Sequence, residues 1–188
     1  KIDFMDSASR ERLAFYDAVA ENLAKNKLMV NFHGANTPTG EERSWPHEMS
    51  REGIYGGEQN IWAAIGGRHY CALPFTRLVS GHADFTGGYF GHGPKLRGSS
   101  WRLQMAANII YTSPVLHWVS NPADMEAAFP KGSPEREAVR NIPSVWDETI
   151  VLPPSAIGEC AAFARRSGDQ WYIALMNGDG RERTVSIP

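Results

Sequence analysis

Residues 2–32 read IDFMDSASRERLAFYDAVAENLAKNKLMVNF, and the order of patterns in this stretch indicates the class of fold. Residues 2–5 form a short apolar run that ends at Asp6-Ser7, as a strand leading into a helix cap would. From Arg10 to Lys25 apolar side chains recur every three or four residues, which predicts an amphipathic helix. Residues 28–32 are a second apolar run. Strand, helix and strand with tight connections predict a βαβ unit with parallel strands.

For about 110 further residues, predicted helices and strands alternate with long loops. Residues 33–57 and 77–98 are rich in glycine and polar residues and weakly periodic, which is typical of functional loops in α/β domains. Residues 101–112 predict a helix and residues 115–119 a buried strand. Asn121-Pro122 and Ser133-Pro134 each pair an N-cap residue with a proline, which predicts two short helices.

The pattern changes after Trp146-Asp147-Glu148. Residues 159–166, 170–177 and 183–187 read as strands, and the first two are joined by a turn at Ser167-Gly168-Asp169. We therefore predict a domain boundary between residues 148 and 149. Residues 1–148 would be of α/β type, and residues 149–188 would open an antiparallel β domain.

Composition excludes several classes of function. A net charge of −2 and a pI near 6.3 argue against a nucleic-acid partner, since no basic surplus is present. No apolar run approaches the roughly 18 residues of a membrane span. Cys71 and Cys160 form no CxxC pair, which argues against a zinc or thioredoxin-like site. They could be two buried free thiols, which we favour, or one disulfide. The chain starts at Lys1 inside an apparent strand, and we expect it to begin within a larger protein.

The most specific motif is LMVNFHGANTPTGEERSWPHEMSREGIYGGEQN, residues 28–60. It resembles glycoside hydrolase family 97, in which a barrel strand ends in DFHGAxxPTGxxRTYPN and REGxxGxE follows. The matching residues are Phe32, His33, Gly34, Ala35, Pro38, Thr39, Gly40, Arg43, Pro46, Arg51, Glu52, Gly53, Gly56 and Glu58. Residues 73–77, 84–86 and 143–149 also match, so the resemblance covers nearly the whole chain. Ser44-Trp45 and His47 depart from the motif.

The resemblance implies a fold and a reaction. Members of this family are α-glycosidases with a (β/α)8 catalytic barrel followed by a β domain, and they bind calcium. The chain would then be the second half of that TIM barrel plus the start of an antiparallel β-sandwich. Inverting α-glucosidases of the family carry glutamate directly after the motif histidine, whereas retaining α-galactosidases carry glycine and use an aspartate on the preceding strand. Gly34 and Asp3 imply the retaining branch.

The two catalytic carboxylates implied by the resemblance are Asp3 and Glu58. Retention needs two carboxyls about 5–5.5 Å apart, one that attacks and one that donates a proton. Asp3, between Ile2 and Phe4, would be the nucleophile, because a carboxylate inside an apolar strand is otherwise unfavourable. Glu58 would be the acid and base, beside glycines that permit close approach of a ligand. The alternatives are an ion pair of Asp3 with Lys1 and a solvated loop position for Glu58.

Four further residues and a metal complete the implied site. Glu52 matches a calcium ligand, and oxygen ligands suit that ion, although Arg51-Glu52 could be an ordinary surface pair. His33 would donate to a sugar hydroxyl and Lys1 would contact substrate. Trp45 could stack on a sugar face or simply pack in the loop. Asp84 could accept from a hydroxyl, but we favour a turn residue.

The predicted function is thus a retaining α-glycoside hydrolase that acts on an α-galactoside or related oligosaccharide. An α-glucosidase of the same family is the enzymatic alternative. The non-enzymatic alternative is that the 188-residue chain alone is an inactive partial barrel that at most binds sugar, because a (β/α)8 barrel needs about 250 residues. The resemblance also implies a periplasmic or secreted bacterial enzyme.

Overall fold

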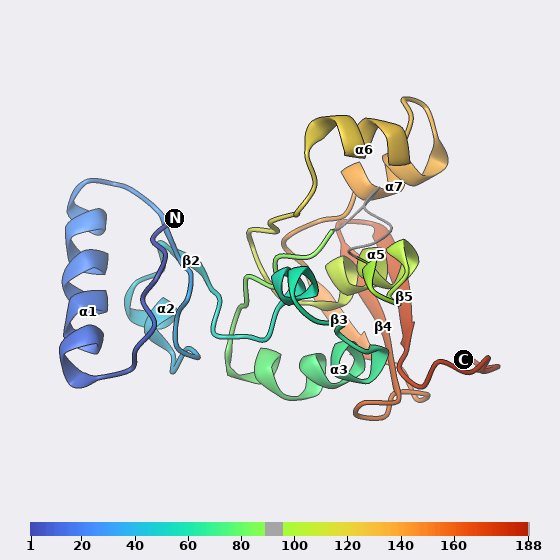
Figure 1. Cartoon of the computed structure of the whole chain (residues 1–188), viewed down its shortest axis with the longest axis horizontal. Coiled ribbons are helices and arrows are strands. Elements are labelled where there is room, and N and C mark those ends of the chain that lie inside the picture. The colour runs from blue at the N-terminus through green and yellow to red at the C-terminus, as the bar shows by residue number, and fades with distance from the viewer. Residues whose placement is uncertain (89–95, 188) are drawn as a thin grey trace.

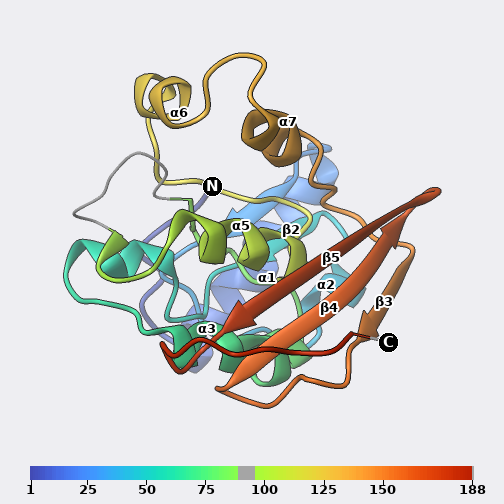
Figure 2. The same ribbon diagram turned by 90° about the vertical axis from the view of Figure 1, so that its right-hand side faces the viewer.

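The computed structural model describes residues 1–88 and 96–187. Helix α1 and the N-terminal strands form one side of the molecule, and a three-stranded sheet with helices packed on it forms the other (Figure 1). Seen from that second side, the strands β3, β4 and β5 run across the front, with α3 and α5 behind them (Figure 2). None of the helices in these two ranges is long and apolar enough to cross a membrane.

The first unit is the predicted βαβ arrangement. Helix α1 spans Arg10–Lys25, and the Ser9 side chain caps it by accepting from the Arg12 N–H. Strand β1 spans Val30–Phe32 and is buried along its whole length. Of the first predicted strand only Ile2 makes a bridge, parallel to Phe32. The prediction of a strand over residues 2–5 is therefore wrong beyond Ile2, because Phe4 and Asp6 turn the chain with φ values of 58° and 45°.

Strand β2, Glu48–Arg51, lies inside the segment that the sequence predicts to be a loop. It pairs in parallel with β1, and the short helix α2, Glu41–Ser44, connects the two. The prediction of a loop over residues 33–57 is wrong here. The sequence Glu-Met-Ser-Arg does not predict a strand, because the buried residues are polar and no apolar alternation is present.

The next segments continue the parallel series in chain order. The Asp84 N–H donates to the Arg51 carbonyl at 3.2 Å, and Gly87 forms a parallel bridge with Trp118. Between them lie short helices: η1 (Gly57–Ile61), α3 (Gly67–Ala72), η2 (Leu73–Phe75), η3 (Arg77–Ser80) and α5 (Trp101–Ile110). Residues 89–95 of the second predicted loop lie outside the described residues. Five segments, at residues 2, 30–32, 48–51, 84–87 and 118, thus follow one another in sequence order. Parallel pairing joins Ile2 to Phe32, β1 to β2 and Gly87 to Trp118, and a single hydrogen bond joins β2 to Asp84.

Two short helices follow as predicted. Helix α6 spans Pro122–Ala128 and helix α7 spans Pro134–Arg140. The side chains of Asn121 and Ser133 each accept a backbone N–H of the first turn, so both predicted caps are confirmed.

The C-terminal sheet has the order β3-β4-β5 and is antiparallel. Strands β4 (Cys160–Ser167) and β5 (Gln170–Asn177) confirm the predicted hairpin. The third strand is not residues 183–187, as the sequence suggests, but β3, Glu148–Val151. It was missed because all four of its residues are exposed and give no burial pattern.

The inner face of this sheet joins the α/β part in one hydrophobic core. Phe163 and Met176 from the sheet pack with Tyr70 of α3, Ala107 of α5 and the intervening Phe85. Cys71 and Cys160 are both buried free thiols, so the disulfide alternative is wrong. The α/β class and the antiparallel sheet are confirmed.

Candidate functional site

His33 follows β1 directly and lies at the centre of a polar cluster. Its imidazole is 5% exposed. On one side Nδ1 lies 3.6 Å from Asp3 Oδ1 and 3.4 Å from Glu52 Oε2. On the other side Nε2 lies 3.2 Å from Thr86 Oγ1 and 3.5 Å from Asp84 Oδ2. Asp3, His33 and Glu52 each directly follow a residue that pairs in parallel, and the carboxyl ends of parallel strands are where active sites of parallel α/β folds are built.

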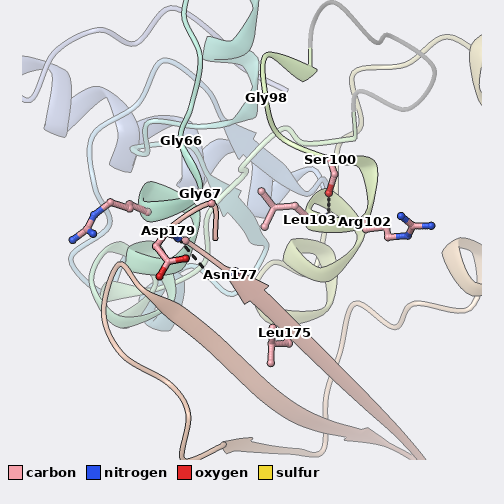
Figure 3. A pocket seen from close by; sticks show the side chains of 12 residues that line it. Gly66, Gly67, Gly98, Ser100, Arg102, Leu103, Leu175, Asn177 and Asp179 are labelled. Carbon is pink, nitrogen blue, oxygen red and sulfur yellow. Dashed lines mark hydrogen bonds between the residues drawn. The ribbon is translucent and has the colours of Figure 1, made fainter. Parts of the chain in front are cut away.

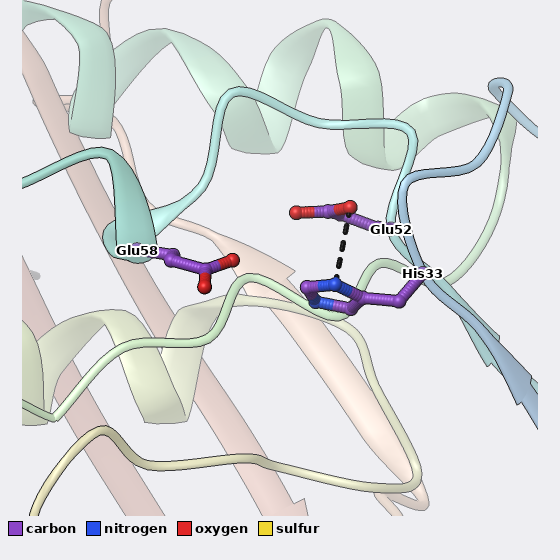
Figure 4. A group of neighbouring side chains, drawn as sticks. All are labelled: His33, Glu52 and Glu58. Atoms are coloured by element: carbon purple, nitrogen blue, oxygen red, sulfur yellow. Dashed lines mark ion pairs between the residues drawn. The ribbon is translucent and has the colours of Figure 1, made fainter. Parts of the chain in front are cut away.

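Glu52 follows β2 and points toward His33 (Figure 4). Its Oε2 accepts the backbone N–H of Gly34 at 2.5 Å. Burial raises the pKa of the Glu52 carboxyl above its ordinary value, and the nearby negative charges of Glu58 and Asp84 act in the same direction. His33 and the Gly34 N–H oppose that shift without cancelling it.

Glu58 enters the cluster from helix η1. A ligand atom from each of His33, Glu52 and Glu58 lies within 4.8 Å of the other two. The glycines before Glu58 let two stretches of backbone approach closely. A Cβ on Gly56 would lie 2.6 Å from the Phe85 carbonyl oxygen. Close contact between these two backbones therefore brings Glu58 to the cluster.

Asp3 lies at the start of the chain, beside the segment that carries His33. Hydrogen bonds from the Ile2 N–H to the Asn31 carbonyl and from the His33 N–H to the Ile2 carbonyl hold the two backbones together. The Asp3 side chain is 43% exposed, and its Oδ1 also accepts the Phe4 N–H at 2.7 Å. Its ionic contact among the described residues is with His33, not with Lys1 as the structural alternative required.

Gly34 makes the approach of Asp3 and Glu52 possible. It has a φ of +55°, in the region that favours glycine. A Cβ there would lie 2.9 Å from Asp6 Oδ1 and 3.2 Å from the Phe4 nitrogen. A side chain at this position would thus push away the segment that bears Asp3.

Asp84 is a site residue that sequence reasoning missed. The preferred interpretation, a turn residue, is wrong. The Asp84 side chain is fully buried, and its Oδ2 lies 2.9 Å from His117 Nδ1 and 2.8 Å from Asn31 Nδ2. The only sequence signal was the Asp-Phe-Thr match, since His117 lies outside the motifs and Asn31 is not among the matching residues in residues 28–60.

Arg51 and Glu52 do not form a surface pair. Arg51 is 2% exposed, and its guanidinium binds both carboxylate oxygens of Glu48, at 2.6 and 3.0 Å. Because side chains alternate along a strand, Arg51 packs toward α1 while Glu52 faces the cluster.

Lys1 and Trp45 are not brought into the cluster by any contact within residues 1–88 and 96–187. Lys1 is exposed. Trp45 precedes β2 and packs edge-on against His47, which bonds the carbonyl of Ala20 in α1. It therefore lies at the opposite end of β2 from Glu52, and sugar stacking by Trp45 finds no support.

The cluster has a donor set that fits a calcium ion in part. Two carboxylates, from Glu52 and Glu58, converge on one point, and carboxylate oxygens are the ligands that this ion prefers. The third neighbour, the His33 imidazole, is a poor calcium ligand, so further oxygen ligands would have to come from elsewhere.

A separate cavity of about 630 Å³ lies between α3, α5 and the end of β5 (Figure 3). Half of its walls are formed by glycine and apolar residues, and Asp179 at its rim is paired with Arg183 at 2.8 Å. It shares no residue with the His33 cluster, so this cavity is separate from the converging carboxylates.

Comparison with known protein families gives two matches. The family model described as glycoside hydrolase 97 matches residues 1–54, and the model described as glycosyl-hydrolase 97 C-terminal, oligomerisation, matches residues 145–188. The predicted boundary between residues 148 and 149 lies near the second match but stays a prediction.

Two curated relatives align with the chain. A probable retaining alpha-galactosidase of Streptomyces bingchenggensis is 36% identical over 188 residues, which are 100% of this chain and 28% of the relative. A retaining alpha-galactosidase of Bacteroides thetaiotaomicron is 34% identical and covers 92% of this chain, which matches 27% of that protein. The chain thus spans little more than a quarter of the length of these relatives.

Solved structures show the same fold. A glycoside hydrolase family 97 enzyme from Pseudoalteromonas sp. strain K8 in complex with panose superposes with a TM-score of 0.76, at 25% identity, over 87% of this chain and 26% of that one. The same enzyme in complex with acarbose gives a TM-score of 0.74 at 26% identity, with the same coverage of both chains. Sequence motifs, both family models, the curated relatives and the fold agree, and the chain belongs to glycoside hydrolase family 97.

Proposed function

We propose that the protein carrying this chain is a retaining α-glycosidase, most specifically an α-galactosidase, with Asp3 as nucleophile and Glu58 as acid and base. One observation carries the proposal: the Asp3 carboxylate lies 3.6 Å from His33 Nδ1, and a carboxylate oxygen of Glu58 lies within 4.8 Å of a ring nitrogen of the same buried imidazole. The two curated relatives with 34–36% identity are named as retaining alpha-galactosidases, which supports the same reaction.

The proposed reaction has two displacements. The Asp3 carboxylate attacks the anomeric carbon, and the bond to the leaving oxygen breaks as Glu58 gives that oxygen its proton. Glu58 then takes a proton from water, the water oxygen attacks the anomeric carbon, and the bond to Asp3 breaks. The exposure of the Asp3 carboxylate suits a nucleophile that must meet substrate. His33, fixed on both ring nitrogens, would contact a sugar hydroxyl.

Gly34 supports the retaining branch over the inverting one. A glutamate at this position would carry a Cβ into the backbone of Phe4, next to Asp3. The space that Gly34 leaves is therefore occupied by the Phe4 backbone, next to Asp3, and by the Asp6 side chain. The two residues that distinguish the branches of the family are physically linked in this chain.

Calcium is part of the proposal, with Glu52 as a ligand and Glu58 close by. When bound, the ion would neutralise the converging carboxylates and help to anchor the sugar. We further propose that the five segments are part of a (β/α)8 barrel, which their sequence order supports. A periplasmic or secreted location is proposed on the family resemblance.

An α-glucosidase of the same family is the second candidate. The solved relatives with 25–26% identity are bound to panose and acarbose, which are both α-glucosides in their linkages. Galactose and glucose differ in the orientation of one hydroxyl, and no residue of the cluster described above distinguishes them.

Hydrolysis of an aryl α-galactoside and an aryl α-glucoside by the complete protein would test the proposal, with the first product anomer followed by NMR. We expect faster hydrolysis of the galactoside and release of the α-anomer. Release of the β-anomer would refute retention, and a preference for the glucoside would favour the second candidate. The 188-residue chain alone should be tested alongside, because an isolated part of a barrel exposes sheet edges and is expected to be inactive.

A further inference from the structure

One carboxylate oxygen of Asp84 lies against two imidazoles. Asp84 Oδ2 is 2.9 Å from His117 Nδ1 and 3.5 Å from His33 Nε2. It also accepts from Asn31 Nδ2 at 2.8 Å, while Oδ1 accepts from the Thr86 hydroxyl at 3.0 Å. A buried carboxylate requires hydrogen-bond donors, and the groups around Asp84 supply them.

These contacts assign the ring protons. At 2.9 Å from an ionised carboxylate oxygen, His117 Nδ1 must carry the hydrogen, because two acceptors at that distance would repel. The Thr86 hydroxyl donates its single hydrogen to Asp84, so it can only accept from His33 Nε2, which lies 3.2 Å away. His33 therefore carries a hydrogen on Nε2, while its Nδ1 faces carboxylate oxygens of Glu52 at 3.4 Å and Asp3 at 3.6 Å, and His117 carries a hydrogen on Nδ1.

We propose, on the basis of the function proposed above, that Asp84 is a positioning residue that fixes the ring tautomers and orientations of His33 and His117. This places His117 beside His33 as a second imidazole of the same site, with Nε2 as an acceptor when the ring is neutral. Asp84 acts directly on His117 and both directly and through Thr86 on His33. His117 lies outside every motif described above, and Asp84 belongs only to the short Asp-Phe-Thr match.

Two features indicate that this arrangement serves more than stability. Thr86 has a φ of 51°, a conformation that is unfavourable for a β-branched residue and that is retained mainly where function requires it. In addition, Asn31 is 7% exposed, and its Oδ1 is buried without a hydrogen-bond partner. A cluster selected only for stability would have a relaxed Thr86 and a satisfied Asn31.

Long-range ¹H–¹⁵N NMR of the complete protein, labelled with ¹⁵N-histidine, would test the assignment without reference to activity. The His33→Gln and His117→Gln variants identify the two signals. We expect the Nε2–H tautomer for His33 and the Nδ1–H tautomer for His117. In Asp84→Asn the His117 signal should lose its Nδ1–H preference, because the ionised acceptor is gone. An Nε2–H tautomer for His117 in the wild type, or no change in Asp84→Asn, would overturn the proposal.

Kinetics with a matched pair at Thr86 separate positioning from packing. Thr86→Val keeps the shape and removes the hydroxyl, whereas Thr86→Ser keeps the hydroxyl and removes a methyl group. If the hydroxyl positions His33, the serine variant retains more activity than the valine variant. If Thr86 only fills space, the order is reversed and the proposal fails.

Asp84→Asn should lower kcat by about 10–100-fold and change KM much less, with an unchanged melting temperature as evidence of folding. Asp169→Asn, in the exposed β4–β5 turn, is the matched control and should match wild type. A fall in melting temperature with normal kcat for the folded fraction would show a merely structural role. If the wild type prefers an α-glucoside, the α-galactosidase proposal fails. The relative activities of the Asp84 and Thr86 variants on the α-glucoside would then still test the positioning role of Asp84.

Discussion

Arg51 and Glu52 are adjacent in sequence but should respond to mutation in opposite ways. Arg51 is buried, binds Glu48 through two hydrogen bonds and Glu41 through a third, and its guanidinium lies 4.5 Å from the Tyr16 ring centre. Glu52 faces the carboxylate cluster from the other side of the strand. We predict that Arg51→Met destabilises the protein and that Glu52→Gln inactivates it while leaving it folded.

The magnitude for Arg51 follows from what its removal leaves behind. Glu48 is 4% exposed, and burial raises the pKa of its carboxyl even with Arg51 present. Removing one partner of a buried ion pair typically costs about 3–5 kcal/mol, because the remaining charge is uncompensated. For a domain of this size each kcal/mol lowers the melting temperature by roughly 2–4 °C, so Arg51→Met should lower it by at least about 6 °C. The double variant Glu48→Gln/Arg51→Met should recover much of this loss.

Glu52→Gln should give the reverse result. The substitution keeps an oxygen that can accept the Gly34 N–H and removes a charge close to those of Glu58 and Asp84. The melting temperature should therefore stay equal or rise, while turnover of the aryl glycoside falls. The assays are differential scanning calorimetry and initial rates on the complete protein. If Arg51→Met melts like wild type, or if Glu52→Gln is as destabilising as Arg51→Met, the division of roles across β2 is wrong.

Four further outcomes are expected for the complete protein. Asp3→Ala should lose turnover, and azide should restore part of it as the β-glycosyl azide; near-normal turnover without azide would exclude Asp3 as nucleophile. Glu58→Gln should retain activity best on substrates with good leaving groups, which need little protonation, and equal losses on all aryl glycosides would contradict its role as acid. Chelator treatment should lower activity and added calcium should restore it, whereas full activity after verified metal removal would count against Glu52 as a ligand. Burial raises the pKa of the Cys71 thiol to about 11, so about one part in a thousand is thiolate at pH 8. Titration with a thiol reagent should therefore find Cys71 reactive only after unfolding.

Helices were predicted well from the sequence because their signals are local. The apolar spacing of residues 10–25 and the caps at Asn121 and Ser133 depend on neighbours within one turn, and the structure confirms all three. Strand β2 failed for the opposite reason. Its side chains are polar, and Arg51 is buried by contacts with Tyr16 of α1 and Glu41 of α2. Because these partners lie outside the strand, no local sequence pattern reveals it. The prediction missed strand β3 because its residues carry no local pattern and its pairing partners lie 12 or more residues away along the chain.

The candidate site shows the same limit. His33, Glu52 and Glu58 were found because they belong to one motif, and Asp3 because the resemblance reached the preceding strand. His117 and Asn31 carry no signal of their own, since a lone histidine or asparagine is compatible with many roles. Their importance depends on Asp84, 53 residues from Asn31 in sequence and 2.8 Å from it in space. Only the fold brings these residues together.

The charge balance of the cluster is itself an argument for function. Carboxylates of Asp3, Glu52 and Asp84 surround one imidazole, and their contacts within residues 1–88 and 96–187 include imidazoles, amides and a hydroxyl but no arginine or lysine. Arg51 is buried and Arg77 is half-buried, yet both turn away from the cluster. Arg51 binds Glu48, and Arg77 donates to backbone carbonyls that include that of Glu52. Folding alone would favour pairing these charges. With its arginines turned away and its carboxylates facing inward, the cluster keeps a negative electrostatic potential. A bound cation would be stabilised by that potential, and so would the positive charge that develops at an anomeric carbon.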